Sequence, residues 1–464
     1  MLVSTLSLRS GALSAVVLLS LYSKSKQQNS YMKKTLLLIA TLLASYVGMA
    51  QETYHPTAEN LKAREQFQDD KFGIFLHWGL YSMMGTTEWI MTNRDINYKE
   101  YPKLAKTFYP SEFDADTWVK AIKAAGAKYI TITTRHHDGF SLFKTATSSY
   151  NSVDGTPFKR DIIKEMADAC QRNGIKLHLY YSHLDWGRED YPVGRTGTGT
   201  GRPKEKANWA SYYKFMNTQL TELLTNYGKV GAIWFDGWWD HDSDAKPFDW
   251  QLEEQYALIH KLQPQCLIAN NHHHTPFPGE DIQIFERDLP GENKAGLSGQ
   301  SIGRLPLESC QTINEHWGYN ITDTLYKSPK ELIQMLVRAA GKNANLLLNI
   351  GPEPGGALPE LALNRLQAIG KWLNKYGETI YGTRGGIIAP HEWGVSTQRG
   401  NKLYIHILNC MDSSLFIPTG NHKIKSATVF GTNKRVNFTK TGNGITLNLD
   451  TIPTDIDYIV ELTL

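Results

Sequence analysis

The sequence contains few cysteines and no CxxC pair. Its four cysteines are spread widely over 464 residues, at Cys170, Cys266, Cys310 and Cys410. This spacing argues against a zinc ribbon and against a thioredoxin-like redox site, because both need two cysteines close together in the chain. We expect buried free thiols, although an exported chain could pair them.

The sequence also lacks an excess of one charge. It carries 49 Lys and Arg against 46 Asp and Glu, which gives a net charge of +3, and it has no long basic stretch. Nucleic acids and other polyanions are bound by clustered positive charge. We therefore expect no nucleic-acid partner.

An apolar run near the N-terminus is typical of an export signal. Residues 32–34 form a short basic region, residues 35–47 are apolar, and residues 48–50 supply the small residues that a signal peptidase reads. The run is short for a membrane span. We predict a secretory signal over residues 32–50 with cleavage near Ala50-Gln51, a periplasmic location, and no membrane span in the mature chain.

Aromatic residues are plentiful, with 12 Trp and 23 Tyr. A flat apolar ring with a hydrogen-bonding edge suits a sugar, which offers a C–H face and a rim of hydroxyls. A large aromatic core would explain this composition equally well. Composition alone therefore does not separate sugar binding from packing.

From residue 72 onward, short apolar runs alternate with segments of helical period. The strand-like runs are residues 72–78, 129–134, 175–181, 232–236, 266–270, 281–286, 305–311 and 343–350. Helix candidates between them are residues 114–125, 160–172, 209–227, 250–262, 328–340 and 359–376. This alternation predicts an α/β fold of the (β/α)8-barrel type. The crossovers from the fifth to the sixth and from the sixth to the seventh strand look irregular, so we expect a degenerate barrel with missing helices.

The hydrophobic pattern of the sequence changes after residue 377. Residues 385–464 contain short alternating runs separated by turn residues, with no helical period. This pattern predicts a C-terminal antiparallel β-sandwich. The expected domains are an N-terminal extension with the signal (residues 1–50), the barrel (51–384) and the sandwich (385–464).

Polar and aromatic residues end nearly every predicted barrel strand. Barrel enzymes carry their chemistry at these carboxyl ends. The residues concerned include His77, the following Glu88-Trp89, residues 135–138, residues 180–181, residues 234–239, residues 270–274, Glu286, Glu308 and Asn349. Any one of these residues could have a structural role, but a structural role for all of them together is a poor explanation. We therefore expect an active site at this end of the barrel.

Asp236 is the candidate nucleophile. It follows an apolar strand, and Trp234, Trp238 and Trp239 surround it in the sequence. A carboxylate held in this way can attack an anomeric carbon, provided that a second carboxyl group protonates the leaving oxygen. The alternative is an ion-paired or helix-capping aspartate.

The second carboxyl group has three candidates. Glu286 closes an alternating strand and is our choice for the acid/base. Glu308 closes the next strand and is the rival, and Glu292 in an irregular loop is third. Each could instead be a surface or ion-paired glutamate.

Clustered histidines at residues 136–137 and 272–274 suggest metal ligands at first. Neighbouring side chains on a strand point to opposite faces, so His136 and His137 cannot both face one metal without a bend. Zinc hydrolases usually show a different spacing. We expect these histidines to bind sugar hydroxyls, with no metal and no cofactor.

Several of these segments together resemble glycoside hydrolase family 29, the α-L-fucosidases. The matching segments are residues 72–79, 88–89, 134–140, 234–237, 316–320 and 345–352. The resemblance covers most of residues 55–385 and continues into the sandwich. It implies an exported bacterial α-L-fucosidase that removes fucose from fucosylated glycans by a retaining mechanism, with Asp236 as the nucleophile.

The resemblance also implies a set of fucose-binding residues, the apolar ones enclosing the C6 methyl group: His77, Glu88, Trp89, His136, His137, Tyr181, Trp234 and Trp317. Family members often carry Asn-Asp-Arg-Trp after the fifth strand, where this chain has residues 270–273 as Asn-Asn-His-His. We therefore expect His272 to replace an arginine contact. The competing hypotheses are a metal-dependent barrel hydrolase, a glycosidase for a galactoside-like sugar, and a carbohydrate-binding protein without activity.

Overall fold

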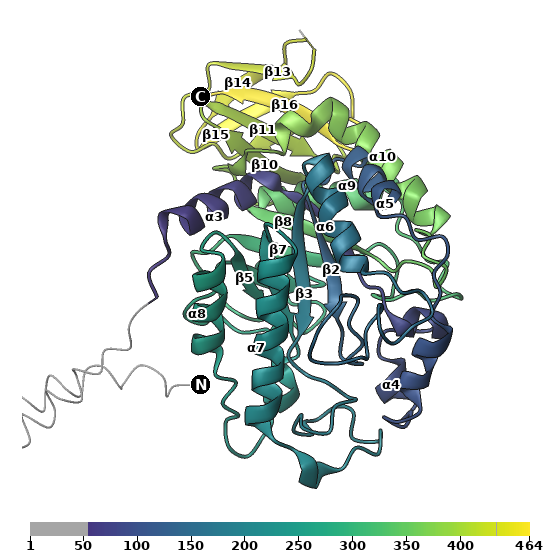
Figure 1. Cartoon of the computed structure of the whole chain (residues 1–464). Helices are drawn as coiled ribbons and strands as arrows, with labels where there is room; N and C mark the ends of the chain where they lie inside the picture. The colour runs from purple at the N-terminus through teal and green to yellow at the C-terminus, as the bar shows by residue number, and fades with distance from the viewer. Residues whose placement is uncertain (1–53, 433) are drawn as a thin grey trace, which may run out of the picture. The chain divides into compact units, whose positions relative to one another are not determined.

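A nearly closed barrel of parallel strands forms the centre of the structure (Figure 1). The computed structural model describes residues 54–432 and 434–464, so the predicted signal lies outside the described residues. The eight strands follow the order β5-β4-β3-β2-β1-β8-β7-β6, and a bridge between Ala269 and Ile282 joins the two end strands. Their bounds are β1 Phe72–Leu76, β2 Tyr129–Arg135, β3 Lys176–Ser182, β4 Ala232–Asp236, β5 Leu267–Asn270, β6 Gln283–Glu286, β7 Leu307–Thr312 and β8 Ala344–Ile350. The predicted barrel is confirmed.

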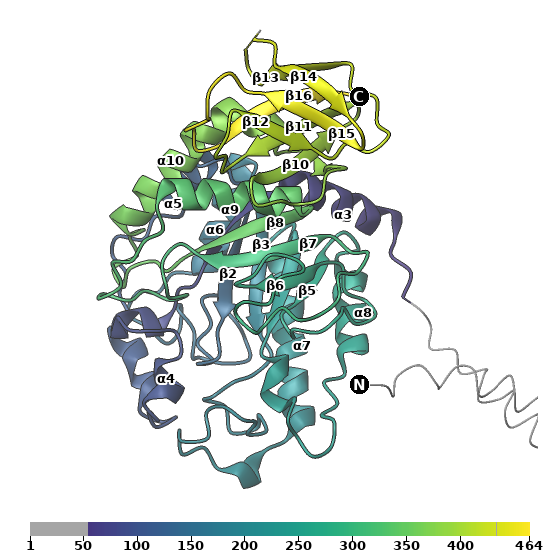
Figure 2. The same cartoon turned by 180° about the vertical axis from the view of Figure 1, so that it is seen from behind.

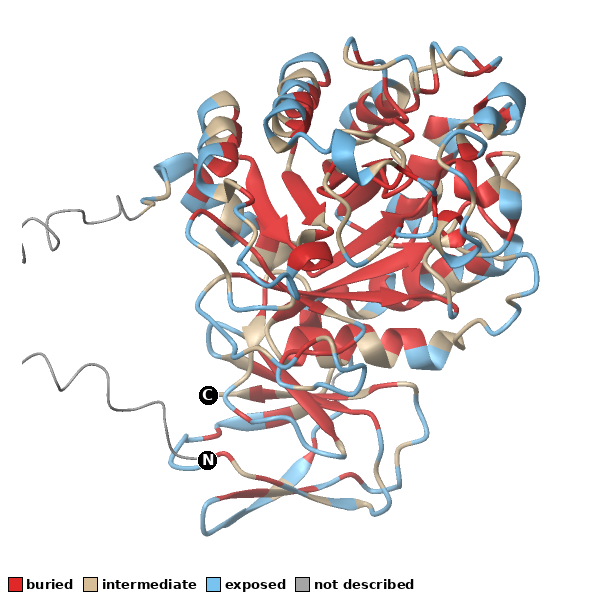
Figure 3. Cartoon of the chain, turned by 90° about the horizontal axis from the view of Figure 1, so that it is seen from below, coloured by how far each residue is buried: buried red, intermediate tan, exposed pale blue. Residues whose placement is uncertain are grey.

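Helices cover the outside of the strands. The helices at predicted positions are α5 Ala115–Ala124, α6 Ile162–Asn173, α7 Trp209–Asn226, α8 Leu252–Leu262, α9 Pro329–Gly341 and α10 Glu360–Tyr376. Side chains cap several N-termini by accepting a backbone N–H, among them Asp114, Asp161 and Ser328. Figure 3 shows buried strands surrounded by helices whose outer faces are exposed.

The predicted gaps in the outer layer are also confirmed. Residues 271–282 and 287–306, all of them described, contain no helix. Figure 2 accordingly shows loops over β6. The shorter elements are α4 Ile90–Asn93 and the 3-10 helices η1 Leu80–Met84, η2 Tyr101–Thr107, η3 Lys204–Lys206, η4 Trp238–His241 and η5 Gly377–Thr379.

Besides the four-residue helix α4, one longer described helix was not expected from the sequence. α3 (Ala58–Asp70) precedes β1, and its Phe67 belongs to the core inside the barrel, where its ring centroid lies 5.4 Å from that of Tyr129. The Phe67 carbonyl also accepts a hydrogen bond from Asn345 Nδ2 at 2.7 Å. α3 therefore packs against the amino end of the barrel, away from the expected site.

Two antiparallel sheets follow the barrel, as predicted. Their strands are β9 Arg384–Gly385, β10 Gly394–Arg399, β11 Lys402–Ile407, β12 Ser414–Ile417, β13 Ser426–Val429, β14 Asn437–Thr441, β15 Gly444–Asn448 and β16 Tyr458–Thr463. The sheets have the orders β13-β16-β11-β10-β9 and β12-β15-β14, and they share one apolar core. Gly341 at the end of α9 lets Val395 of β10 approach closely. Residues 56–464 form one compact unit, so the boundary between residues 384 and 385 stays a prediction.

Alternate side chains of the strands point into the barrel and prepare the site. The interior core includes Phe75, Tyr180, Trp234 and Cys310, whereas a larger core lies between the strands and the helices. Because side chains alternate along a strand, Asp236 continues the inward series of Trp234. All four cysteines are free, and three of them are buried. Within residues 54–464, no described helix has the length and apolar character to cross a membrane.

Candidate active site

A pocket of about 180 Å³ opens among the expected residues at the carboxyl ends of the strands. The lining residues that the sequence predicted are His77, Glu88, Trp89, His136, Trp234, Asp236, Glu286 and Trp317. The pocket is further lined by Phe75, Arg195, Trp239, Asn271, His273, Leu297 and Cys310.

The Asp236 carboxylate is held by donors on both oxygens. Its Oδ1 accepts hydrogen bonds from Gly237 N at 2.8 Å and from Trp239 Nε1 at 3.0 Å. Its Oδ2 accepts a hydrogen bond from the Tyr180 hydroxyl at 2.9 Å. Gly237 adopts φ 96°, a left-handed conformation that suits glycine and turns the chain directly after β4. The carboxylate is therefore fixed in orientation before a ligand binds.

Glu286 lies next to Asp236, and one amide links them. Asn271 Nδ2 is 2.8 Å from Glu286 Oε2 and 3.5 Å from Asp236 Oδ1. His273 Nε2 is a further 2.9 Å contact of Glu286 Oε2. Two carboxyl groups and their polar partners thus meet in one small pocket, the arrangement that acid/base work on a sugar needs.

The pKa values of the two carboxyl groups shift in opposite directions. Burial, and then the charge of Glu286, raise the pKa of Asp236 to about 6. Burial also raises the pKa of Glu286, but the contacts with His273 and Asn271 outweigh burial and hold this pKa below its ordinary value. His273 and Asn271 therefore stabilise the ionised form of Glu286.

Two pocket histidines are held as neutral rings. Asn349 Nδ2 donates to the Trp317 carbonyl at 2.7 Å, so its Oδ1 is the atom that accepts from His77 Nδ1, also at 2.7 Å. Burial lowers the pKa of His77 to about 4 and that of His136 well below its ordinary value. The His136 ring stacks on Tyr180 at 5.4 Å between ring centroids. His77 therefore presents Nε2 as an acceptor.

Glu88 and Trp89 contact neighbouring loops at the edge of the pocket. Glu88 Oε2 accepts a hydrogen bond from Gly318 N at 2.9 Å, next to the pocket residue Trp317. The Trp89 ring stacks on Trp239 with 5.5 Å between centroids. The residues predicted from the loop after β1 therefore lie at the site.

Tyr181 lies outside the pocket lining, one position after the tyrosine that contacts Asp236. Tyr181 faces α7, where its hydroxyl donates to Gln219 Oε1 at 2.7 Å, and it does not line the pocket. Tyr180 faces inward and contacts Asp236 instead. Neighbouring strand residues point to opposite sides, so a shift of one residue moves the side chain to the other face.

His272, which was expected to replace an arginine contact, also lies outside the pocket lining. His272 is buried behind the pocket, with its Nε2 at 3.0 Å from Glu280 Oε1. Its neighbour His273 has a left-handed backbone (φ 65°) and points to Glu286. His137 is not part of the pocket lining, but its Nε2 lies 3.5 Å from Asp236 Oδ2.

The rival acid/base, Glu308, lies inside the barrel below the pocket lining. Its Oε2 accepts from the Tyr129 hydroxyl at 2.6 Å and its Oε1 accepts from Trp234 Nε1 at 2.9 Å. Both oxygens are thus occupied, and the residue is 1% exposed. Glu292 lies outside the pocket lining and pairs with Lys294 and Lys342. Glu286 alone of the three candidates reaches Asp236.

Four further residues at the site belong to segments that the sequence placed at strand ends: Tyr180, Trp239, Asn271 and His273. Sequence reasoning missed Arg195. Arg195 belongs to the Gly- and Thr-rich loop after β3 and lies 3.2 Å from Asp242 and 5.2 Å from the Trp239 ring centre. Its position in a loop after a barrel strand was the available signal. Among the described residues, no group of three His, Cys, Asp or Glu side chains could hold a metal ion.

Comparison with known proteins assigns this arrangement to a family. The sequence model of the α-L-fucosidase family matches residues 41–378. The plasma α-L-fucosidase of Rattus norvegicus is 30% identical over 406 residues, which cover 80% of this chain and 82% of that protein. α-L-Fucosidase isoenzyme 1 from Paenibacillus thiaminolyticus is 35% identical with a TM-score of 0.78, covering 88% of this chain and all of that one.

A further solved structure carries information on chemistry. It is a glycoside hydrolase family 29 α-L-fucosidase from Bacteroides thetaiotaomicron, trapped as a covalent intermediate with 2-fluoro-fucosyl fluoride. It is 27% identical, has a TM-score of 0.76, and the match covers 89% of this chain and 98% of that one. The family match, the relatives and the fold agree with the pocket and its carboxyl pair. This chain belongs to glycoside hydrolase family 29, and it is an α-L-fucosidase.

Proposed function

We propose that the enzyme releases terminal α-L-fucose from oligosaccharides or glycoconjugates with retention of configuration, through a covalent fucosyl–Asp236 intermediate. Glu286 first donates a proton to the leaving oxygen and then removes a proton from the attacking water. The double displacement needs one carboxylate at the anomeric carbon and one carboxyl group at the glycosidic oxygen.

The observation that carries this proposal is the bridging amide of Asn271. Its Nδ2 lies 3.5 Å from one oxygen of Asp236 and 2.8 Å from one oxygen of Glu286. Those two oxygens are therefore separated by at most the sum of the two distances, about 6.3 Å, which is shorter than the about 6.5–9.5 Å of inverting enzymes. The separation is compatible with the about 5–5.5 Å of retaining enzymes.

The pocket wall supports a 6-deoxy sugar as the substrate. Phe75, Trp234, Cys310 and Trp317 supply an apolar side, and His77 and His136 supply polar atoms nearby. A methyl group gains from apolar contacts, whereas the hydroxyl that a galactoside has at this carbon would lose its hydrogen bonds there. A small pocket of this kind favours a terminal residue over an internal one.

The test uses an activated aryl α-L-fucoside and two variants, Asp236→Gly and Glu286→Ala. We expect the wild type to release α-L-fucose first and both variants to be slow. Azide should rescue both with opposite stereochemistry. In Asp236→Gly it displaces the aryl group once and gives β-L-fucosyl azide, whereas in Glu286→Ala it attacks the fucosyl-enzyme and gives the α-azide. The same azide anomer from both variants, or β-L-fucose as the first product, contradicts the mechanism.

Two controls address the competing hypotheses. Dialysis against a chelator leaves a carboxylate mechanism intact and inactivates a metal-dependent hydrolase. Aryl α-L-fucoside and aryl galactosides at equal concentration compare the two sugars directly. A folded wild-type chain that binds fucose but hydrolyses none of these glycosides would support the carbohydrate-binding alternative.

We also propose that the enzyme acts after export to the periplasm. The basic start, apolar run and small residues of 32–50 support this location. N-terminal sequencing of the protein recovered from a periplasmic fraction should begin near Gln51. Recovery from the cytosol with residues 32–50 intact would refute the proposal.

A further inference from the structure

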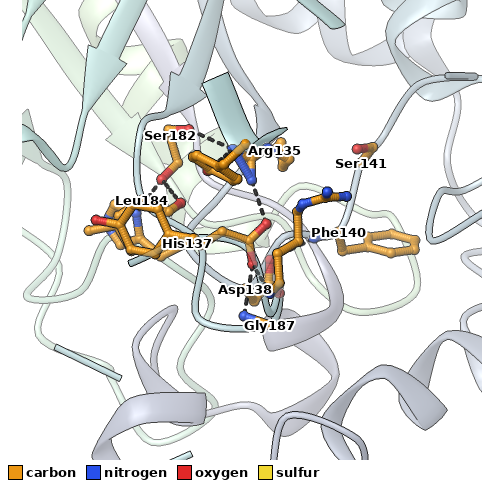
Figure 4. A network of polar contacts seen from close by, with 12 residues as sticks. Arg135, His137, Asp138, Phe140, Ser141, Ser182, Leu184 and Gly187 are labelled. Atoms are coloured by element: carbon orange, nitrogen blue, oxygen red, sulfur yellow. Dashed lines mark hydrogen bonds and ion pairs between the residues drawn. The ribbon is translucent and has the colours of Figure 1, made fainter. Parts of the chain in front are cut away.

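The Ser182 hydroxyl lies between the His137 ring and a backbone carbonyl, at the end of β3. Its Oγ is 2.6 Å from the Leu184 carbonyl oxygen and 2.7 Å from His137 Nδ1. Figure 4 shows the three residues beside the buried Arg135. Ser182 and His137 are both buried.

The single proton of the serine hydroxyl decides the direction of both contacts. A carbonyl oxygen cannot donate, so the contact between Ser182 Oγ and Leu184 O requires the serine proton to lie between the two oxygens. Ser182 Oγ then has only lone pairs left for His137. The donor in the second contact is therefore His137 Nδ1–H.

The other ring nitrogen of His137 faces the nucleophile. Nε2 lies 3.5 Å from Asp236 Oδ2, farther than the about 2.7–3.2 Å of an N–H···O bond. Burial lowers the pKa of His137 well below its ordinary value, so the ring is neutral. A neutral ring with its proton on Nδ1 carries a lone pair on Nε2. Two acceptors thus face each other. A hydroxyl group placed beside them could donate a hydrogen bond to His137 Nε2.

We propose that Ser182 is a positioning residue that holds His137 in the Nδ1–H form, so that Nε2 accepts a hydrogen bond from a sugar hydroxyl bound beside Asp236. The identity of the sugar rests on the proposed function, but the protonation of the ring does not. In the opposite tautomer, Nε2–H would point at Asp236 Oδ2 and would stabilise the carboxylate in its resting state. The nucleophile would then be weakened, because an attacking lone pair would be engaged.

A buried ion pair keeps this geometry in place. Arg135 Nη1 donates to Asp185 Oδ2 at 2.7 Å, and Arg135 Nη2 donates to the Ser182 carbonyl at 2.8 Å. Trp186 N donates to the His137 carbonyl at 2.7 Å, which joins the loops after β2 and β3. The backbones of Ser182 and His137 are therefore both anchored, so their side chains meet without further ordering.

The direct test is ¹⁵N NMR of the wild-type chain labelled with [¹⁵N]histidine. His137→Gln identifies the His137 signals by their loss. We expect a protonated Nδ1 and an unprotonated Nε2 throughout the neutral pH range, since the two nitrogen types differ strongly in chemical shift. An Nε2–H ring or a doubly protonated ring in the wild type would overturn the inference.

Ser182→Ala tests the role of the hydroxyl, and Ser309→Ala is its matched control. Ser309 Oγ is also buried and donates to a backbone carbonyl, that of Asp288, at 2.6 Å, but it contacts no histidine. We expect Ser182→Ala to move the His137 signals toward the Nε2–H form and to lower kcat/KM on an aryl α-L-fucoside by about tenfold. Ser309→Ala should change neither.

Equal losses of kcat/KM in the two serine variants, or unchanged His137 signals in Ser182→Ala, would refute the role of Ser182. If Ser182→Ala does not fold, the wild-type spectrum still decides the tautomer. A wild type with the expected ring but without activity on α-L-fucosides would contradict the proposed function alone.

Discussion

Glu308→Gln separates a structural carboxyl group from a catalytic one. Glu308 receives one hydrogen bond on each oxygen, from Tyr129 and from Trp234, and does not line the pocket. Glutamine keeps an oxygen acceptor for Trp234 and can donate its amide hydrogen to the Tyr129 oxygen. We expect kcat/KM of Glu308→Gln to stay close to that of the wild type, whereas Glu286→Gln should lose most activity on a substrate with a poor leaving group.

Glu308→Gln should also change how the free energy of unfolding depends on pH. Burial raises the pKa of Glu308 from 4.5 to about 7 in the folded protein. Below pH 4.5 the group is protonated in both states. Between pH 4.5 and about 7 the unfolded chain has released this proton and the folded chain still holds it, so the free energy of unfolding falls as pH rises. At about 1.4 kcal/mol for each pKa unit, this loss reaches about 3 kcal/mol above pH 7.

Denaturant unfolding of wild type and Glu308→Gln at pH values below and above this window measures the effect. The stability of the variant relative to the wild type should increase by about 3 kcal/mol from the acidic to the neutral condition, because glutamine does not titrate. Glu205→Gln, at an exposed position, is the control for a change of charge alone. A stability difference independent of pH, or a loss of activity in Glu308→Gln equal to that in Glu286→Gln, would refute the reasoning.

Two further predictions concern His273, which contacts Glu286, and Asp185, which pairs with Arg135. His273→Phe removes contacts that hold the pKa of Glu286 low, so this pKa should rise. A ¹³C NMR titration of the Glu286 carboxyl group that shows an unmoved or lowered pKa would contradict this role. Asp185→Ala leaves the buried Arg135 without its carboxylate and should lower the free energy of unfolding by about 3–5 kcal/mol. Asp168→Ala, at an exposed ion pair, should cost less than about 1 kcal/mol in the same denaturant assay, and equal losses would count against the burial argument.

The positions of the barrel strands were predictable because each is a short apolar run between helical segments. The rule that barrel chemistry sits at the carboxyl ends of strands then led to Asp236 and Glu286. Both positions close a strand whose last inward residues are apolar. The candidate nucleophile and the candidate acid could therefore be selected before their contacts were known.

The structure differs from the predictions where the sequence does not show which way a side chain points or where a helix lies. Tyr180 and Tyr181 are both buried, one inside the barrel and one against α7, so hydropathy does not show which faces the site. His272 and His273 lie after a strand in a loop, where no periodicity orients side chains. α3 buries only Asn60 and Phe67, which is too little to produce an apolar stripe.

The single bridge between β5 and β6 divides the active site into two parts that differ in their tolerance to insertions and deletions. Asp236 belongs to β4, within the continuous run of paired strands, whereas Asn271, His273 and Glu286 flank the single bridge and the helix-free loops. Insertions or deletions in these loops can alter the surroundings of Glu286 and leave Asp236 where it is. If the proposed mechanism holds, such changes would adapt the enzyme to new aglycones without moving the residue that forms the bond to the sugar.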